Sequence, residues 1–213
     1  GNINDLMGYI FKKKDVVDIT GNLKATYMKF DELLSMNDKS KSKELESMPR
    51  WINADLNTSI TNFSYDDFIG SDITGQLNYN KQILKGENIK LKSLNGSIFG
   101  NFKLYESKSK KTTLFSQLNL RKLNIRNAFL AFNNFNQDFI TSEHIKGIGT
   151  AEIQMQATWN PGFIFEEEGL KVKSHLVIEK GELIQFKPLE SLSDYVSLDD
   201  LKTVKFSTLE NTI

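Results

Sequence analysis

Residues 17–27 read VDITGNLKATY, and this stretch alternates apolar and polar side chains with a period of two. Apolar or small residues occupy every odd position from Val17 to Tyr27, and polar residues occupy every even position. Successive side chains of a β-strand point to opposite faces of its sheet. The stretch therefore predicts a strand with one apolar and one polar side.

The same alternation recurs along the chain and predicts a mainly β protein. We expect strands over residues 52–61, 73–79, 98–104, 114–120, 151–159, 170–178 and 182–187, with a last strand from Thr203. Lys180-Gly181 is interpreted as a turn between two of these strands, residues 106–113 as a hairpin tip, and residues 37–47 as a loop.

A weak repeat with an internal glycine lies within these strands. It has the form apolar-x-Gly-x-apolar around Gly21, Gly75 and Gly100, and a looser copy contains Gly147 and Gly149. Glycine inside a strand is typical of a β-bulge or of a close approach of backbone or ligand. We interpret the repeat as bulges in a curved sheet, with the close approach as the alternative.

Three segments have helical rather than strand periodicity. Residues 3–11 and residues 188–196 predict short helices, the second of which begins with a proline. Between them, NAFLAFNNFNQDF (127–139) belongs to an apolar stripe with helical steps of four, three, three and four: Ile125, Phe129, Phe132, Phe135 and Phe139. This stripe predicts a helix that caps an apolar sheet face or, alternatively, an ordinary core helix.

Composition excludes several classes of function. Lys plus Arg equals Asp plus Glu at 27 each, and this balance argues against nucleic acid as a partner. The chain has no cysteine, so disulfides and thiol chemistry are excluded. His144 and His175 are not in ligand-like spacing, and we find no catalytic motif, so we expect no enzyme, no metal and no cofactor.

The predicted fold is a strongly curved antiparallel sheet that forms a groove, taco-like or jelly-roll-like, with two or three short helices in one domain, residues 1–213. A closed sandwich would cover the apolar sides with a second sheet, whereas an open groove would suit acyl chains. The residues we expect to line such a groove are Ile73, Leu77, Tyr79, Ile98, Phe102, Ile153 and Met155. A carbohydrate-binding module is a further alternative, and it requires exposure of Trp51 or Trp159.

The second half of the chain resembles the C-terminal region of AsmA-family proteins. The resemblance covers about residues 118–213 and rests on three features. They are AFNNFNQDFIT leading into IKGIGTAEI, the unit LVIEKGELIQFKPLESLSDYV, and the closing SLDDLKTVKFSTLENTI. Outside this region, only the general strand pattern is similar.

The resemblance implies a non-enzymatic envelope protein that is tethered to the inner membrane and projects into the periplasm. It implies phospholipid acyl chains as the ligand, in an apolar groove that supports lipid transport to the outer membrane and its maintenance. The alternative is an interaction scaffold of the envelope, in which the apolar face is closed and the sheet edges or the helix bind another envelope protein. No apolar run reaches the ~20 residues of a spanning helix, so we expect this chain to be a piece of a longer protein with its anchor outside residues 1–213.

Overall fold

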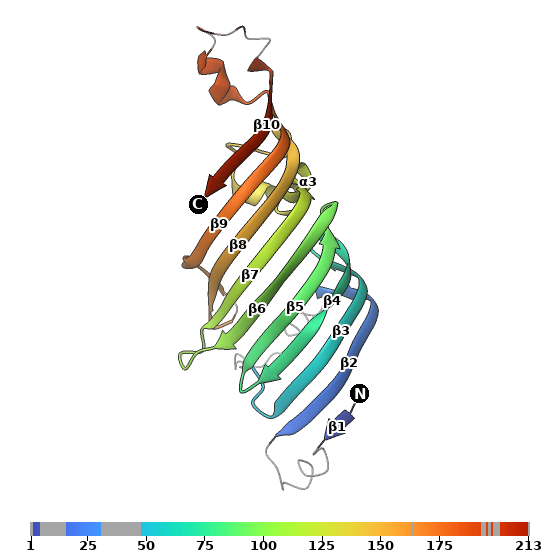
Figure 1. Cartoon of the computed structure of the whole chain (residues 1–213). Coiled ribbons are helices and arrows are strands. Elements are labelled where there is room, and N and C mark those ends of the chain that lie inside the picture. The colour runs from blue at the N-terminus through green and yellow to red at the C-terminus, as the bar shows by residue number, and fades with distance from the viewer. Residues whose placement is uncertain are drawn as a thin grey trace.

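The computed structural model describes residues 2–4, 16–30, 48–162, 164–192, 195, 197 and 201–212. Its main feature is one 10-stranded sheet in which the strands follow one another in sequence order (Figure 1). The strands are β1 (Asn2–Asn4), β2 (Val17–Lys29), β3 (Ile52–Tyr65), β4 (Phe68–Asn80), β5 (Ile83–Ser93), β6 (Gly96–Glu106), β7 (Thr112–Asn124), β8 (Ile145–Asn160), β9 (Ile164–Ile184) and β10 (Thr203–Thr212).

Helical structure is short and lies between strands or near the end of the chain. The helical elements whose bounds lie in the described residues are the α-helix α3 (Ile125–Ala131) and the 3-10 turns η2 (Asn133–Asn136) and η3 (Lys187–Leu192). The sheet is not closed, so the prediction of a mainly β, open and curved sheet is confirmed. Neighbouring strands are antiparallel except for β2 and β3, which are parallel. The expectation of a purely antiparallel sheet was therefore wrong at this one pair.

Several local predictions differ from the structure. Asn2–Asn4 forms strand β1 rather than the start of a helix, because it pairs with β2, while residues 5–11 and 37–47 lie outside the described residues. Strand β5 was not predicted. Lys180-Gly181 is not a turn, because β9 continues through it for 21 residues. Where residues 188–196 are described, the structure has the shorter turn η3 in place of the predicted helix. The hairpin tip near residues 106–113 and the last strand from Thr203 are confirmed.

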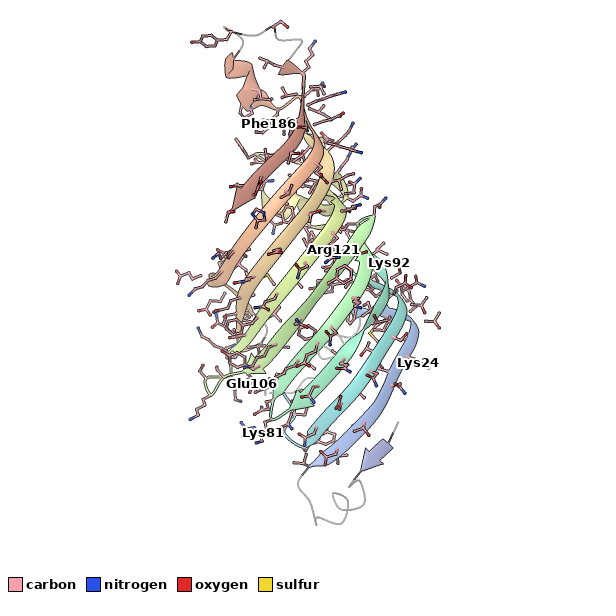
Figure 2. The ribbon with its side chains drawn as sticks, viewed as in Figure 1. Lys24, Lys81, Lys92, Glu106, Arg121 and Phe186 are labelled. Atoms are coloured by element: carbon pink, nitrogen blue, oxygen red, sulfur yellow. The ribbon has the colours of Figure 1, made fainter. Side chains whose placement is uncertain are left out.

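The pairing register places the apolar side chains of successive strands on one side of the sheet. We call this side the apolar face; it includes Ile19, Leu23, Leu56, Ile60, Ile73, Leu77, Ile98, Leu118, Leu120, Ile153 and Leu176. The opposite side, the polar face, carries residues such as Lys24, Lys92 and Arg121, which are labelled in Figure 2. The side-chain period of two thus holds across the sheet.

No second sheet packs against either face in the described part of the chain, and no large side chain there is less than 2% exposed. The whole chain exposes 14937 Å². A compact monomer of its 24.3 kDa would expose about 10,000 Å². A single open layer explains this excess, because much of the apolar face cannot be sealed by another layer.

Bulges interrupt the strands, mostly toward the end that carries α3, which we call the cap end. Register shifts place an extra residue at Asp72, Asn88, Lys122 and Lys180, all of which have positive φ. Each extra residue bends its strand and raises the local twist. The glycine repeat was interpreted as bulges: Gly75 and Gly147 each lie opposite a bulge in the neighbouring strand, at Asn88 and Lys180, whereas Gly21 and Gly100 have register partners on β3 and β7.

Three glycines on the apolar face lie under phenylalanine rings from the neighbouring strand. The pairs are directly opposite in the register: Gly70 with Phe63, Gly86 with Phe102, and Gly181 with Phe206. A Cβ at any of these glycines would collide with the ring. A ring lying over glycine shields the backbone that glycine leaves bare and helps to fix the register of a curved sheet.

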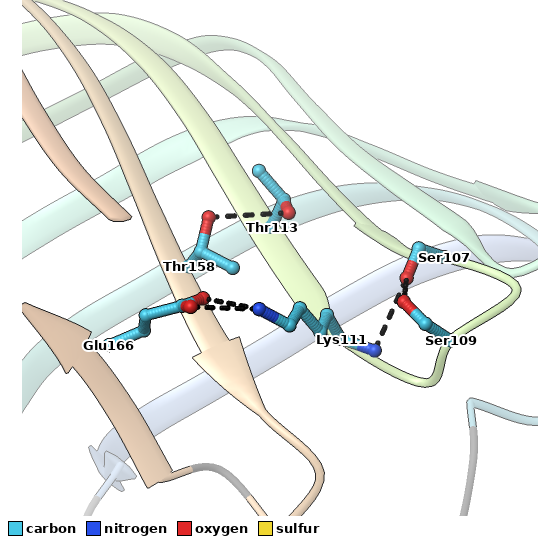
Figure 3. A network of polar contacts seen from close by, with 6 residues as sticks. All are labelled: Ser107, Ser109, Lys111, Thr113, Thr158 and Glu166. Carbon is cyan, nitrogen blue, oxygen red and sulfur yellow. Dashed lines mark hydrogen bonds and ion pairs between the residues drawn. The ribbon is translucent and has the colours of Figure 1, made fainter. Parts of the chain in front are cut away.

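The opposite end, the hairpin end, is held by polar contacts near the β6–β7 loop (Figure 3). Lys111 Nζ donates to both carboxylate oxygens of Glu166 at 2.8 and 2.9 Å, joining the β6–β7 loop to β9. The hydroxyls of Thr113 and Thr158 lie 3.5 Å apart, and Thr158 is opposite Glu166 in the register. Because the ion pair is partly exposed, its contribution is modest, and the ladder of backbone hydrogen bonds dominates at this end.

The Gly86–Phe102 pair gives a direct test of the curved register. We expect Gly86→Ala to lower the free energy of unfolding by about 1–3 kcal/mol, because the new methyl group displaces the ring. The same change in a Phe102→Leu background should cost less, since the obstacle is gone. A double-mutant cycle from urea unfolding measures the coupling, and additive effects would contradict the packing described.

Candidate functional site

The seven residues predicted to line a groove all lie on the apolar face. Leu77 is opposite Leu56, Ile98 is opposite Leu120, and Phe102 and Met155 flank the same residue of β7. Six of the seven are half-buried: Leu77, Tyr79, Ile98, Phe102, Ile153 and Met155. The exception is Ile73, which is only 8% exposed and belongs to a buried cluster.

Two buried clusters lie on this face at the cap end. One contains Ile60, Phe63 and Ile73, with partly buried neighbours from β2, β4 and β5. The other contains Ile125, Ile145 and Ile178, with Phe129 of α3 and Phe206 of β10 packed against it. Between these clusters and the hairpin end, large apolar side chains such as Leu77, Phe102 and Met155 are only half-buried, whereas the smaller Thr58 and Ser116 are buried. The middle of the apolar face is therefore the part that is available to a ligand.

A chain of aromatic contacts links the two clusters across the cap end. Phe132 follows α3 and stacks on Phe68 of β4 with 5.5 Å between ring centroids. On one side of this pair, Phe63 lies 5.8 Å from Phe68 and 6.0 Å from Phe30. On the other side, Phe135 lies 5.6 Å from Phe132 and 5.1 Å from Phe129. We call Phe30, Phe63, Phe68, Phe132, Phe135 and Phe129 the aromatic bridge.

The helix that supports this bridge is shorter than predicted. α3 begins at Ile125, where the Asn124 side chain accepts a hydrogen bond from Asn127 N at 2.9 Å, and ends at Ala131. Residues 133–136 then have positive φ angles of 46–56°, which a right-handed helix cannot contain. Asparagine tolerates this conformation better than most residues. The prediction of one continuous helix through Phe139 was therefore wrong, although Phe129, Phe132 and Phe135 still come together.

At the hairpin end, residues 48–50 cross the apolar face, and this crossing was not predicted. Met48 N donates to Glu106 Oε2 at 3.0 Å, and Gln82 Nε2 donates to Met48 O at 2.8 Å. One residue further on, the Tyr79 hydroxyl donates to Pro49 O at 2.5 Å. These bonds carry residues 48–50 from β6 back toward β3. Hydrophobic periodicity gives no signal for such a crossing, because it depends on single polar contacts.

Tyr79 is the titratable group of this crossing. Burial raises the pKa of its phenol above the ordinary value, and the nearby Glu106 carboxylate raises that pKa further. Both effects favour the neutral phenol that donates to Pro49 O. The residue we expected to line a groove is therefore also a hydrogen-bond donor that holds the crossing segment.

Three hollows of the described surface lie over the polar face. A shallow hollow of about 540 Å³ is lined by β5, β6 and β7 and includes Asn101, Lys103 and Gln117. Two more, of about 330 and 350 Å³, continue from Gln117 across Gln154 and Lys173. Phe115 at their edge stacks on Tyr105 with 6.1 Å between centroids. These hollows are wide and shallow, with side chains that can hydrogen-bond a polar ligand.

The two tryptophans differ in exposure. Trp51 is 47% exposed, whereas Trp159 is half-buried and contacts Phe165 at 5.9 Å between ring centroids. Neither residue lines the polar hollows described above. A carbohydrate-binding module requires an exposed tryptophan, and of the two tryptophans only Trp51 meets this requirement.

Within the described part of the chain, no three His, Cys, Asp or Glu side chains are grouped so that they could hold a metal ion. No helix of that part is long and apolar enough to cross a membrane. No protein-family model matches the chain, and no curated protein or solved structure is detectably similar to it. The function is therefore inferred from the two faces of the sheet.

The aromatic bridge predicts a strong effect of one substitution. Phe63 is 3% exposed and contacts both Phe30 and Phe68. We expect Phe63→Ala to lower the free energy of unfolding by about 3–5 kcal/mol, because it leaves a cavity at the cap end. Phe139→Ala is the control, since Phe139 is 67% exposed and should cost about 1 kcal/mol or less. Equal losses in urea unfolding would contradict the bridge.

The Tyr79 hydroxyl predicts an effect that depends on pH. We expect Tyr79→Phe to lower the free energy of unfolding by about 0.5–1.5 kcal/mol near neutral pH, because Pro49 O loses its donor. The folded protein holds the phenolic proton more tightly than the unfolded chain does. The wild type should therefore lose more stability than the variant as pH rises above about 10, and parallel pH profiles would contradict this assignment.

Proposed function

We propose that this chain is a non-enzymatic lipid-binding domain whose apolar face holds the acyl chains of phospholipids. The observation that carries the proposal is the open, half-buried apolar face, lined by Leu77, Ile98, Phe102, Ile153 and Met155. Burial of an acyl chain on such a surface gains about 0.8 kcal/mol per methylene group. A ligand of this kind would cover the side of the sheet that has no second layer.

The two ends of the face favour an elongated apolar ligand over a compact one. The aromatic bridge borders the cap end, and residues 48–50 cross near the hairpin end. Between them, one register row across the apolar face runs through Leu56, Leu77, Gly86, Phe102, Ser116 and Met155, and Ser116 is its one polar residue. An extended acyl chain fits a continuous apolar strip better than a rigid polar molecule does.

The resemblance of residues 118–213 to the AsmA family supplies the biological setting of the proposal. In that setting the domain belongs to a periplasmic protein tethered to the inner membrane, and it supports phospholipid transport to the outer membrane and maintenance of that membrane. No catalytic step is required for this function. Transfer would depend on the relative free energy of the acyl chain on the apolar face and in a bilayer.

The hollows of the polar face favour a second candidate, a carbohydrate-binding module. Amide side chains such as Asn101, Gln117 and Gln154 can hydrogen-bond hydroxyl groups, and the exposed Phe115 offers a flat apolar surface beside them. Under this candidate, the ligand would occupy the opposite side of the same strands. The scaffold alternative would instead use the sheet edges or the helix as a protein contact.

Two substitutions on neighbouring positions of β8 separate lipid from carbohydrate binding. Ile153 belongs to the apolar face and Gln154 to the polar face. We expect Ile153→Asp to lower uptake of a fluorescent phospholipid by about tenfold or more, because a carboxylate on the apolar face opposes acyl burial. Gln154→Asp, the matched control, should leave uptake unchanged.

Ile153→Thr is a second variant that avoids a new charge and should give a smaller loss of uptake with the fold intact, as checked by circular dichroism. Phospholipid should also be detected by mass spectrometry after extraction of the purified wild type. Absence of both bound lipid and lipid uptake contradicts the proposal. Loss of glycan binding in Gln154→Asp alone would favour the carbohydrate-binding module.

A further inference from the structure

A patch of exposed apolar side chains surrounds α3 and η2 at the cap end. Phe132 and Phe135 are 45% and 54% exposed, although both belong to the aromatic bridge. Leu130 is 55% exposed, and Ile69 at the start of β4 is 66% exposed. We call Ile69, Leu130, Phe132 and Phe135 the cap patch. Single exposed apolar residues are normal, whereas a group of large ones marks a contact with a protein or a membrane.

Two members of the cap patch from distant parts of the sequence face a common hollow. Ile69 and Leu130 line a space of about 500 Å³ together with Leu94, Asn95 and Asn127. The helix and the β3–β4 turn are therefore close neighbours here. Ile69 and Leu130 thus share one hollow, and Phe132 and Phe135 follow Leu130 in the same segment of the chain.

The segment that forms most of the patch is held in place. Asn134 Oδ1 accepts a hydrogen bond from Ser142 N at 2.9 Å, and Gln137 Oε1 accepts one from Ile140 N at 2.9 Å. Ring contacts fix Phe132 and Phe135 against Phe68 and Phe129. The apolar side chains are thus presented in one arrangement, and little conformational entropy is lost when they are covered.

The chemistry of this segment suits the interfacial region of a phospholipid bilayer. Residues 127–137 contain no charged side chain, only asparagine, glutamine, alanine, leucine and phenylalanine. A segment of this kind can enter the headgroup and acyl boundary without burial of a charge. The charges beside it have opposite signs: Arg126 and Asp138 flank it in sequence, and Asp67 lines the hollow.

The position of the patch also favours a bilayer as its occupant. Phe132 belongs to the patch and stacks on Phe68, which packs against the buried cluster of the apolar face. The exposed patch and the apolar face are therefore joined through one pair of rings. A lipid that moves between a bilayer and the apolar face would pass this junction without exposure of its acyl chains to water.

We infer that the cap patch docks this domain on a phospholipid bilayer, with Ile69, Leu130, Phe132 and Phe135 inserted at the level of the headgroups. The inference rests on the proposed function, since the docked bilayer would be the donor or acceptor of the lipid. Because the charges named beside the patch, Arg126, Asp138 and Asp67, are not predominantly positive, docking depends on apolar insertion and not on anionic lipid.

Sedimentation with phosphatidylcholine vesicles tests the inference. We expect the wild-type chain to bind these vesicles and Ile69→Ser/Leu130→Ser to bind them about tenfold more weakly. The matched control is Ile164→Ser/Leu170→Ser, which removes side chains that are 65% and 45% exposed on β9 away from the cap patch and should bind like the wild type. Phe135→Ser is a second variant of the patch, and addition of phosphatidylglycerol should change wild-type binding little.

Uptake of a short-chain phosphatidylcholine below its micelle concentration separates this inference from the proposed function, because uptake of monomers needs no bilayer. Loss of vesicle binding with unchanged monomer uptake in the patch variant supports docking. Failure of the wild type to bind vesicles, equal losses in the control variant, or binding only to anionic vesicles overturns docking while leaving lipid binding intact. Vesicle binding without monomer uptake overturns the proposed function and leaves docking as a separate property.

Discussion

The structure depends on one constraint: its strands are apolar on one side only, yet the described chain supplies a single sheet. An amphipathic sheet is stable only if its apolar side is removed from water. Here that removal is partial. Two buried clusters around Phe63 and Ile125 stabilise the cap end, whereas the middle of the face is shielded only by its own side chains. This incomplete burial connects the stability of the fold to the function we propose.

Curvature is the means by which a single layer shields itself. Bulges at Asp72, Asn88 and Lys122 bend consecutive parts of the sheet, and phenylalanine rings lie over glycines where the backbones approach. Bending brings β4 close enough to the end of α3 for Phe68 and Phe132 to stack. The aromatic bridge is therefore a consequence of the curved sheet as well as a support for it.

Much of the fold could be predicted from the period of two, because each strand needs to bury one side. The period could not reveal that β9 passes through Lys180 without a turn, since Lys180-Gly181 suits either a turn or the bulge that it forms opposite Gly147. Helical spacing predicted the phenylalanine stripe but not its interruption after Ala131, where residues 133–136 adopt a left-handed conformation. The groove candidates share one face, as predicted. The period could not reveal that the phenylalanine stripe is linked by ring contacts to Phe68, Phe63 and Phe30, nor that residues 48–50 cross at Tyr79, because both features depend on contacts between distant residues.

The central claim is that acyl chains lie on the apolar face, and site-specific photo-crosslinking tests it most directly. A photoreactive phenylalanine analogue at Ile98 would sit on the apolar face of β6, whereas the same analogue at Asn119 would sit on the polar face of β7. After incubation with phospholipid and irradiation, mass spectrometry should detect a lipid adduct at position 98 and none at position 119. Adducts at position 119, or at neither position while the protein remains folded, would contradict the account.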